Sequence, residues 1–570
     1  MRRRTAWILA ASVVAVSLGA AAVGALALLL RGRGPTGFGG KSYLFLRLEG
    51  AIPDQPPGDL GLILQRRPPS LRTLVESLDR AARDPKVSAV VVRVSMLPDA
   101  GWGKVQELRD AVVRFRKSGK PAYAHLEFCG NKEYYLATAC SKIYALPTAI
   151  LDVSGLSAEV TFFREGLDKL GVEAQFEGVG KYKNAPNQFT ESSFTEPHRE
   201  QMEALVDSLF GQYLTGIAAG RAKTVEEVRA LVDEGPYDAA EALKAGLVDE
   251  LLYQDQWEAR LNEADRVTPS RYVKAARGFS FDSRPKIALV YAVGEIVPGE
   301  SESGAFGGSV AGSDTVASAF RQAREDDAVK AVVFRVDSPG GFGPAADAIW
   351  RAVALARKSK PVVVSMGDYA ASGGYYVSMA SDVIVAEPGT LTGSIGVFSG
   401  KFNLRGLYDK LGISKEIVAR GRNASLYSEY RPWSPEERAK VRGMNVAFYE
   451  AFVKKAAEGR KTSYEQVDAV AQGRVWTGAD ALDRGLVDRL GGLDAAVAAA
   501  KEKAGIARDR EVNLVVLPER KGLFETFLER QEDDVTSTAL PSDLRLLLRF
   551  VRVLGDGAPM TRLPFDLKIR

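Results

Sequence analysis

A serine followed by two glycines stands just after a predicted buried strand, at Ser372 in the stretch DYAASGGYY, residues 368–376. A glycine-lined turn from strand to helix can present a serine hydroxyl at the end of a sheet and turn the next N–H toward an oxyanion. The start of a helix adds a favourable dipole. The matching stretch of the first half reads FCGNKEYY and has no serine. The pattern indicates a nucleophile, although a packing turn of small residues has the same composition.

A nucleophilic serine needs a base, and the chain contains only two histidines, His125 and His198. One lies inside a predicted strand and the other at the start of a predicted helix, so both are interpreted as structural. Lysine is the other base known to pair with serine, provided that burial lowers its pKa. The first half offers VGKYKNAP, with Lys181 and Lys183, and the matching ARGRNASL of the second half has no lysine. One half keeps a serine and the other a lysine, which is typical of a shared site, although most lysines are solvated.

A glycine pair follows another predicted strand of the second half, in DSPGG, residues 337–341. Glycines at a strand end let the backbone turn its N–H groups into a cavity, because no Cβ is in the way. The first half reads SMLPDAG at this place and lacks the pair. An ordinary Pro-Gly turn is the alternative.

The elements that carry these residues occur twice. Four pairs of stretches match in the same order, at offsets of 239 to 244 residues: LRLEGAIPD with VYAVGEIVPG, SAVVVRV with KAVVFRV, PAYAHLEF with PVVVSMGD, and EALKAGLVDEL with DALDRGLVDRL. Short apolar runs alternate with helical patterns in each half, which predicts an α/β fold of βαβ units. We expect a Gly/Ser-rich loop over residues 299–313.

The predicted organisation has five parts. They are a tip and anchor (1–34), a first repeat that supplies the lysine (41–251), a connector (252–285), a second repeat that supplies the serine (286–505) and a C-terminal extension (506–570). The extension has no counterpart in the first half. It contains a predicted strand, VNLVVLP, and two predicted helices near 521–534 and 542–554.

The N-terminal segment predicts a single membrane span. Residues 7–30 form 24 uncharged residues, enough to cross a hydrocarbon core of about 30 Å. Three arginines precede this segment and two follow it, which favours a cytoplasmic N-terminus and an extracytoplasmic body. An apolar stretch this long favours an uncleaved anchor over a signal peptide, although Ala-rich patterns that resemble cleavage sites occur within it.

The charge balance argues against one class of partner. The formal charge is +4, from 76 Lys+Arg and 72 Asp+Glu, and the five arginines of residues 1–33 leave 71 bases against 72 acids in the rest. A nearly neutral body disfavours a nucleic-acid-binding surface. The two cysteines, Cys129 and Cys140, have no metal-ligand spacing around them and are either a disulfide pair or small buried residues.

The motifs DSPGG, AASGGYY and PGTLTGSIGVF (388–398), in that order on a duplicated body behind one anchor, resemble the signal peptide peptidase A family in its long tandem form. This is the membrane-anchored Ser–Lys protease family also called protease IV. The resemblance covers about residues 42–505. It implies two tandem domains with the fold of Clp protease and crotonase, built of stacked ββα units.

The resemblance also implies roles for five residues. Ser372 corresponds to the nucleophile, and Lys183 to the general base of the family's Y-K-S-A pattern, which here reads YKNA. Ser394, in LTGSIG, corresponds to the serine that hydrogen-bonds the lysine. Gly341 and the N–H of Gly373 correspond to the oxyanion hole.

The family digests remnant signal peptides after preprotein processing and assembles as a homotetramer. The resemblance therefore implies a single-pass protease of the bacterial inner membrane, with its catalytic body on the extracytoplasmic side and no metal or cofactor. Its partners would be cleaved signal peptides or other extended apolar peptides, and the bilayer through residues 7–30. The alternatives are a crotonase-like acyl-CoA hydratase or isomerase, which belongs to the same fold family, and a catalytically inactive membrane scaffold.

Overall fold

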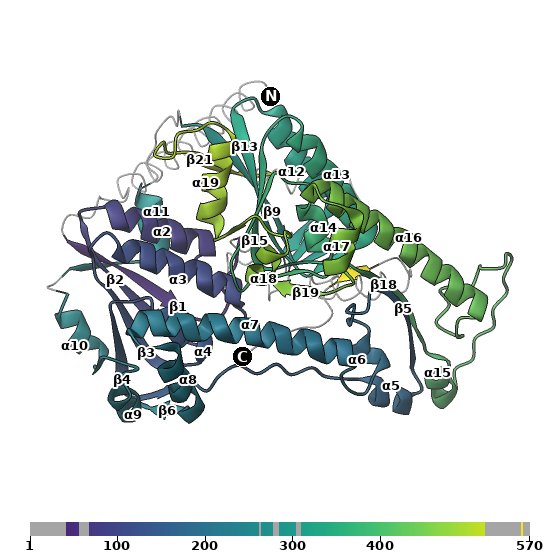
Figure 1. Cartoon of the computed structure of the whole chain (residues 1–570), viewed down its shortest axis with the longest axis horizontal. Helices are drawn as coiled ribbons and strands as arrows, with labels where there is room; N and C mark the ends of the chain where they lie inside the picture. The colour runs from purple at the N-terminus through teal and green to yellow at the C-terminus, as the bar shows by residue number, and fades with distance from the viewer. Residues whose placement is uncertain are drawn as a thin grey trace, which may run out of the picture.

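The fold is α/β and uses one arrangement of strands and helices twice (Figure 1). The computed structural model describes residues 41–55, 68–261, 264–276, 284–303 and 309–518, and the backbone of strand β22 (Met560–Arg562). The predicted anchor at 7–30 and the two predicted helices of the C-terminal extension lie outside these residues. Within the part described, no helix is long and apolar enough to cross a membrane.

The first half builds a mostly parallel sheet in the order β6-β4-β3-β2-β1-β8. Its main strands are β1 (Ser42–Leu48), β2 (Val87–Val94), β3 (Ala122–Cys129) and β4 (Lys142–Leu151). The helices between them are α2 (Leu71–Arg83), α3 (Trp102–Arg116) and α4 (Asn131–Ala137). Two short strands, β6 (Tyr237–Asp238) and β8 (Asp265–Val267), complete the two edges. Strand β8 lies in the segment expected to be a connector and pairs with β1.

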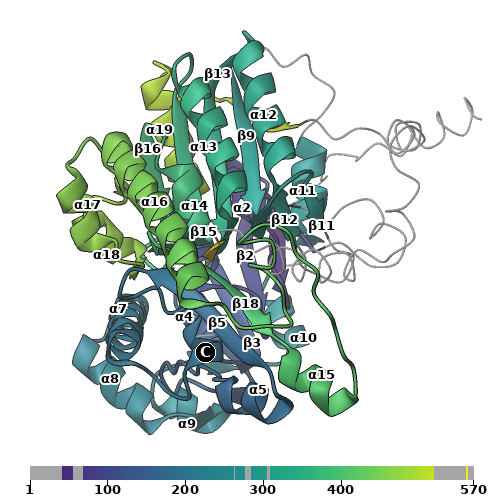
Figure 2. The ribbon, with the colours of Figure 1, turned by 90° about the vertical axis from the view of Figure 1, so that its right-hand side faces the viewer.

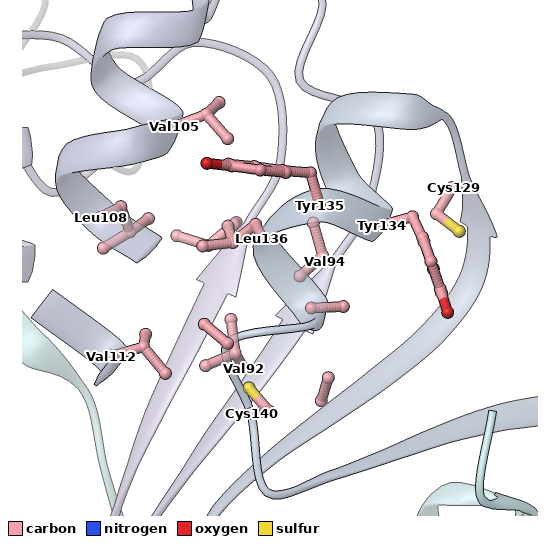
Figure 3. Close-up of a cluster of buried hydrophobic side chains, with 14 of the residues drawn as sticks. Val92, Val94, Val105, Leu108, Val112, Cys129, Tyr134, Tyr135, Leu136 and Cys140 are labelled. Carbon is pink, nitrogen blue, oxygen red and sulfur yellow. The ribbon is translucent and has the colours of Figure 1, made fainter. Parts of the chain in front are cut away.

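Continuous apolar runs form these strands because helices or loops cover both faces of the sheet. Figure 3 shows part of the first core, where valines of β2 meet Val105, Leu108 and Val112 of α3. Cys129 and Cys140 lie in this core and are free, so they are small buried residues and not a disulfide pair.

The second half repeats the pattern in a sheet of order β19-β17-β15-β13-β9-β21, in which β17 is Leu391–Gly393. Its parallel strands are β9 (Lys286–Val293), β13 (Val329–Ser338), β15 (Val362–Ala371) and β21 (Asn513–Leu517). Helices α12 (Ser313–Glu325) and α13 (Gly343–Arg357) pack on one face (Figure 2). Helix α19 (Leu493–Lys503) packs on the other face. The strand predicted in the C-terminal extension is confirmed as β21.

A third sheet, of order β11-β12-β10-β14-β22-β18-β5, joins the two halves, and its central β14 is Gly340–Phe342. Strand β5 (Glu173–Val179) of the first half pairs antiparallel with β18 (Val397–Asn403) of the second over seven residue pairs. Helix α16 (Pro435–Arg460) of the second half packs on β5, while α7 (Glu196–Arg221) of the first half packs on β19 (Val475–Thr477). Each half therefore covers part of the other.

The expectation of an irregular loop over 299–313 is wrong at its ends. Strands β11 (Glu302–Ser303) and β12 (Ser309–Gly312) pair with each other, and β12 also pairs with β10 (Glu295–Val297). A Cβ at Gly294 would lie 1.6 Å from the Ser309 carbonyl oxygen. Small residues here permit close backbone packing, which is why a composition typical of loops occurs in strands.

A cluster of buried charges lies where the two halves meet. The amine of Lys104, on α3 of the first half, lies 3.0 Å from Asp54, 2.6 Å from Asp337 and 3.5 Å from Asp368. The last two carboxylates belong to β13 and β15 of the second half. Burial lowers the pKa of Lys104, but the three carboxylates outweigh it and hold that pKa well above its ordinary value. This lysine is therefore a fixed cation.

Arg335 makes the reciprocal contact from the second half to the first. Its guanidinium donates to Asp54 at 2.8 Å and lies 2.9 Å from Glu107 on α3. The Asp368 carboxylate accepts the backbone N–H groups of Gly101 and Lys104, both at 2.8 Å. The start of α3 is therefore tied to β15, which ends at Ala371, just before Ser372.

We predict that Lys104→Met destabilises the protein. The substitution leaves Asp54, Asp337 and Asp368 without their shared cation, and breaking a buried ion pair costs about 3–5 kcal/mol. The free energy of unfolding, from urea denaturation, is the measurement. The matched control is Lys142→Met, which removes an exposed lysine 3.4 Å from Asp249 and should cost under about 1 kcal/mol. Equal losses in the two variants would contradict the role given to the cluster.

Candidate active site

Ser372 occupies the turn between β15 and helix α14 (Gly373–Ser378). Its backbone has φ 55° and ψ −112°, a strained conformation of the kind found where a side chain must be presented at the end of a sheet. Its N–H donates to the Gly393 carbonyl at 2.8 Å, and its carbonyl accepts the Tyr376 N–H at 2.8 Å. The residue is thus fixed on both sides and is fully buried.

Lys183 follows β5 and reaches Ser372 from the first half of the chain. Its Nζ lies 2.7 Å from the Ser372 Oγ and 2.9 Å from the Ser394 Oγ, and it donates to the Ser394 carbonyl at 3.3 Å. Ser394 follows strand β17 (Leu391–Gly393), and its N–H donates to the Arg474 carbonyl at 2.7 Å. The structure brings together the three side chains that the resemblance singled out from two halves of the chain.

The loop that carries Lys183 is held by contacts with the second half. The Tyr182 N–H donates to the Gln472 carbonyl at 2.8 Å. Gly473 lies so close that a Cβ there would be 2.5 Å from the Lys183 backbone nitrogen. The Tyr182 hydroxyl donates to the Glu200 carboxylate at 2.8 Å, and Arg474 pairs with the same carboxylate at 2.6 Å. These contacts fix the lysine loop from both repeats.

Burial sets the charge of Lys183. The residue is 5% exposed, and burial alone lowers its pKa well below the ordinary value of 10.5. No ion pair joins it to a carboxylate among the described residues, in contrast to Lys104 with its three aspartates. Two buried lysines of one chain thus have opposite pKa shifts, because one has acidic neighbours and the other has hydroxyls. A neutral amine at hydrogen-bond distance from a serine hydroxyl can accept its proton.

Gly341 and Gly373 lie on neighbouring elements beside Ser372. Gly341 belongs to strand β14 (Gly340–Phe342), has φ +155°, and a Cβ there would lie 2.1 Å from the Ile296 carbonyl oxygen. Gly373 is the first residue of α14, where backbone N–H groups have no acceptor within the helix. Strand β14 packs against α14, and a Cβ at Gly374 would lie 2.6 Å from the Ser338 carbonyl oxygen. The glycines therefore permit an approach that side chains would block.

The other candidate bases lie in different surroundings. The Lys181 side chain is exposed, with its Nζ 4.6 Å from the centre of the Tyr182 ring. His125 is buried in β3 with its Nε2 3.3 Å from the Leu252 carbonyl. His198 is buried at the start of α7 with its ring 4.8 Å from that of Phe194, and burial lowers its pKa to about 4. The structural interpretation of both histidines agrees with these contacts.

Sequence reasoning missed the residues that support the site. Asp337 and Asp368 stand within the quoted motifs, and their positions just before the glycine pair and just before Ser372 were the available signal. No signal in the sequence pointed to Lys104 or to the Gln472–Gly473 pair. They act across the two halves, and neither lies in a motif or in a matched stretch.

Comparison with known proteins points to one family. The profile of Peptidase family S49 matches residues 114–268 and 354–507, one match in each repeat. The chain is 37% identical to serine protease SPPA, chloroplastic, of Arabidopsis thaliana, over 84% of this chain and 71% of that protein. It is 34% identical to Protease 4 of Salmonella typhi, over 81% of this chain and 78% of that protein.

One solved structure, ClpP1 from Listeria monocytogenes, aligns with 36% of this chain and 94% of its own at 16% identity and a TM-score of 0.23. A score this low does not establish a common fold, so the Clp protease/crotonase-like assignment of the two repeats stays a prediction.

We predict that Lys183→Met stabilises the protein at neutral pH. The amine has a lowered pKa in the folded state and an ordinary one in the unfolded state, so unfolding of the wild type takes up a proton. That uptake favours unfolding at pH values below about 10.5 and disappears above it. As the pH rises from the folded pKa to about 10.5, the difference in free energy of unfolding between Lys183→Met and wild type should therefore shrink by about 1.4 kcal/mol per pH unit.

Urea denaturation of both proteins at a series of pH values measures this difference. The control is Lys181→Met, which removes an exposed amine two residues away and should change stability little. A difference between Lys183→Met and wild type that does not vary with pH would show that the buried amine is not neutral.

Proposed function

The chain belongs to peptidase family S49, and from this premise we propose that it is a serine endopeptidase that uses Ser372 as nucleophile and Lys183 as general base. The observation that carries the proposal is the 2.7 Å approach of the Lys183 Nζ to the Ser372 Oγ, at a buried place where the pKa of the amine is lowered. Histidine would be the usual base, but the contacts of His125 and His198 lie elsewhere. The Lys183 amine is therefore the base that we propose.

The proposed reaction follows acyl transfer through a serine. Neutral Lys183 accepts the hydroxyl proton as the Ser372 Oγ attacks a peptide carbonyl carbon. The N–H groups of Gly341 and Gly373 stabilise the tetrahedral oxyanion. The protonated lysine then gives its proton to the leaving amine, and the acyl-enzyme forms. Water, deprotonated by the same amine, hydrolyses the ester and restores Ser372.

Ser394 is proposed to position the base. Its hydroxyl and its carbonyl both lie within 3.3 Å of the Lys183 Nζ. Among the described residues, no carboxylate pairs with this amine. These neutral acceptors orient the amine and, unlike a carboxylate, do not raise its pKa strongly. The amine therefore stays oriented and neutral at the same time.

We propose remnant signal peptides as substrates, in agreement with the sequence resemblance. Such peptides are apolar and remain next to the bilayer after preprotein processing. An enzyme anchored by residues 7–30, with its body on the extracytoplasmic side of a bacterial inner membrane, would meet them at high local concentration. The uncharged length of that segment supports the anchor.

We propose that the protein assembles as a homotetramer, as the family resemblance implies. Helices α5 (Arg164–Leu170) and α15 (Arg405–Leu411) lie together at one corner of the molecule (Figure 1), and exposed leucines at their ends support contact with another copy. The helices end there in Leu170 and Leu411, which are 55% and 63% exposed.

We predict that Ser372→Ala and Lys183→Ala each abolish cleavage of unfolded casein and of a synthetic signal peptide. Either change removes one partner of the proton transfer, so kcat should fall by about 10⁴-fold or more. Lys181→Ala, two residues from the base, should keep wild-type activity. Activity that survives both substitutions at the dyad would refute the mechanism. If the wild type cleaves no peptide but hydrates an acyl-CoA, the crotonase-like alternative is favoured. If it has neither activity, the inactive scaffold is favoured.

We also predict that Gly473→Ala impairs catalysis through its contact with Lys183. The new Cβ would lie 2.5 Å from the Lys183 backbone nitrogen and displace the base, and a misplacement of about 1 Å costs about 100-fold in rate. The matched control is Gly412→Ala. Both glycines have positive φ, +77° and +70°, but a Cβ at Gly412 meets nothing within 4 Å. Comparable loss of kcat in both variants would show that backbone strain, and not displacement of Lys183, is the cause.

A further inference from the structure

The buried charges between the two repeats do not balance. Among the described residues, the amine of Lys104 and the guanidinium of Arg335 face four carboxyl groups, those of Asp54, Glu107, Asp337 and Asp368. All six residues are at most 9% exposed. A buried carboxyl group that lacks a cation of its own keeps its proton, because the charged form is poorly solvated there. The excess of acids therefore indicates that the cluster holds at least one proton.

A hydrogen bond between two carboxyl groups places this proton. Asp337 of the second repeat and Asp54 of the first are hydrogen-bonded to each other. One of the two must carry a proton, since an ionised carboxylate can only accept. Asp54 contacts both cations, Lys104 at 3.0 Å and the Arg335 Nε at 2.8 Å, whereas the ion pair of Asp337 is with Lys104 alone, at 2.6 Å. The two cations favour the charged form of Asp54, so the proton lies on Asp337.

The charges around the pair have the corresponding effects on both pKa values. Burial raises the pKa of Asp54, but Lys104 and Arg335 outweigh it and hold that pKa below its ordinary range. Burial also raises the pKa of Asp337, and the neighbouring Asp54 and Asp368 raise it further against the effect of Lys104, to about 7. The carboxylate of Asp368 accepts two backbone N–H groups at 2.8 Å, which favours its charged form.

Asp337 contacts both segments that carry the groups of the proposed site. It is the ninth residue of β13, four positions before Gly341. Its Oδ1 accepts the N–H of Tyr369, three positions before Ser372, at 3.0 Å. Its carbonyl accepts the N–H of Gly294 at 2.9 Å, next to strand β10, which pairs with Gly341. A movement of Asp337 would therefore shift the glycine strand and the serine turn relative to each other.

We propose that Asp337 is a positioning residue whose bound proton holds strand β14 in place beside Ser372, so that catalysis requires Asp337 in its neutral form. This inference rests on the proposed protease function, since it names the regulation of that same site by pH. With the proton in place, Asp337 donates to Asp54 and joins the two repeats. Without it, the charges of Asp54, Asp337 and Asp368 repel one another around a single amine.

The surroundings of Asp337 transmit this repulsion to the backbone. A Cβ at Gly367 would lie 2.8 Å from the Asp337 Cβ, so strand β15 already packs closely on this side chain. The displacement then falls on residues 337–341, which lead to the oxyanion strand. A misplacement of about 1 Å costs about 100-fold in rate. Ionisation of Asp337 should therefore lower kcat, whereas loss of the proton from Lys183 raises it, and the two together give a bell-shaped pH profile.

The test compares kcat of wild type, Asp337→Asn and Asp249→Asn, in the full chain, for a synthetic signal peptide over a series of pH values. Asparagine cannot ionise, its oxygen can accept the Tyr369 N–H, and its amide can donate to Asp54. We expect the ratio of kcat of Asp337→Asn to that of wild type to be constant below about pH 6. It should rise above about pH 7 and increase by about tenfold or more by about pH 9, since only wild type loses the proton.

Asp249→Asn is the matched control. Asp249 also accepts a backbone N–H, that of Ile143 at 2.8 Å, and also contacts a cation, Arg221 at 3.0 Å, but these contacts lie within the first repeat. Its kcat ratio to wild type should not vary with pH. A constant ratio for Asp337→Asn, or an equal rise in both variants, would overturn the proposal.

A second measurement detects the proton without substrate. The pKa of Asp337 is raised to about 7 in the folded state from about 4 in the unfolded chain, so the folded protein binds one more proton between these values. In urea denaturation, the unfolding equilibrium constant of wild type relative to that of Asp337→Asn should rise about tenfold per pH unit over this range and stay constant above it. A ratio that is the same at every pH would show that Asp337 holds no such proton, and would overturn the proposal as well.

Failure of the proposed protease function gives a different result. If wild type hydrolyses no peptide at any pH, kcat cannot be compared, but the unfolding measurement still applies. A ratio of unfolding constants that depends on pH would then support a proton-linked contact between the repeats in a protein without protease activity. A constant ratio would refute the contact itself.

Discussion

The structure depends on keeping one lysine amine buried without an acid beside it. Burial lowers the pKa of Lys183, and the groups that contact its amine are two hydroxyls and a carbonyl. A carboxylate in the same place would hold the amine in its charged form, as three aspartates do for Lys104. The lowered pKa also requires that water be kept away from the amine, and both halves of the chain must close around it to do so. No single repeat provides that enclosure.

The duplicated chain provides this enclosure because its two repeats contribute different residues to the site. The first repeat sends Lys183 from the end of β5, and the second presents Ser372 and Ser394. The antiparallel pairing of β5 with β18 sets the position of the lysine loop, and the Tyr182–Gln472 and Lys183–Gly473 contacts adjust it locally. The same two strands that align the halves thus also bring Lys183 close to Ser372.

Buried charges also hold the two repeats together at their interface. Lys104 and Arg335 each extend from one repeat into carboxylates of the other, and Asp337 and Asp368 lie just before the glycine pair and the serine. A buried ion pair adds little net stability over an apolar contact, but it tolerates few alternative geometries. We interpret the cluster as a device that selects one relative position of the repeats. Local strain at Ser372 can persist because that position is fixed on both sides.

The sequence alone determined the elements and the residue types of the site. Apolar runs, glycine pairs and the repeated order of motifs predicted the α/β repeats, the strand-to-helix turn at Ser372 and the shortage of histidine bases, because these are properties of neighbouring residues. The distance between Lys183 and Ser372, 189 positions apart, and the role of Lys104 and Gly473 were decided only by the tertiary structure. So was the place of β22, which no periodicity in residues 506–570 indicated. Contacts between distant segments depend on how strands of two repeats align in a shared sheet, and no local pattern encodes that alignment.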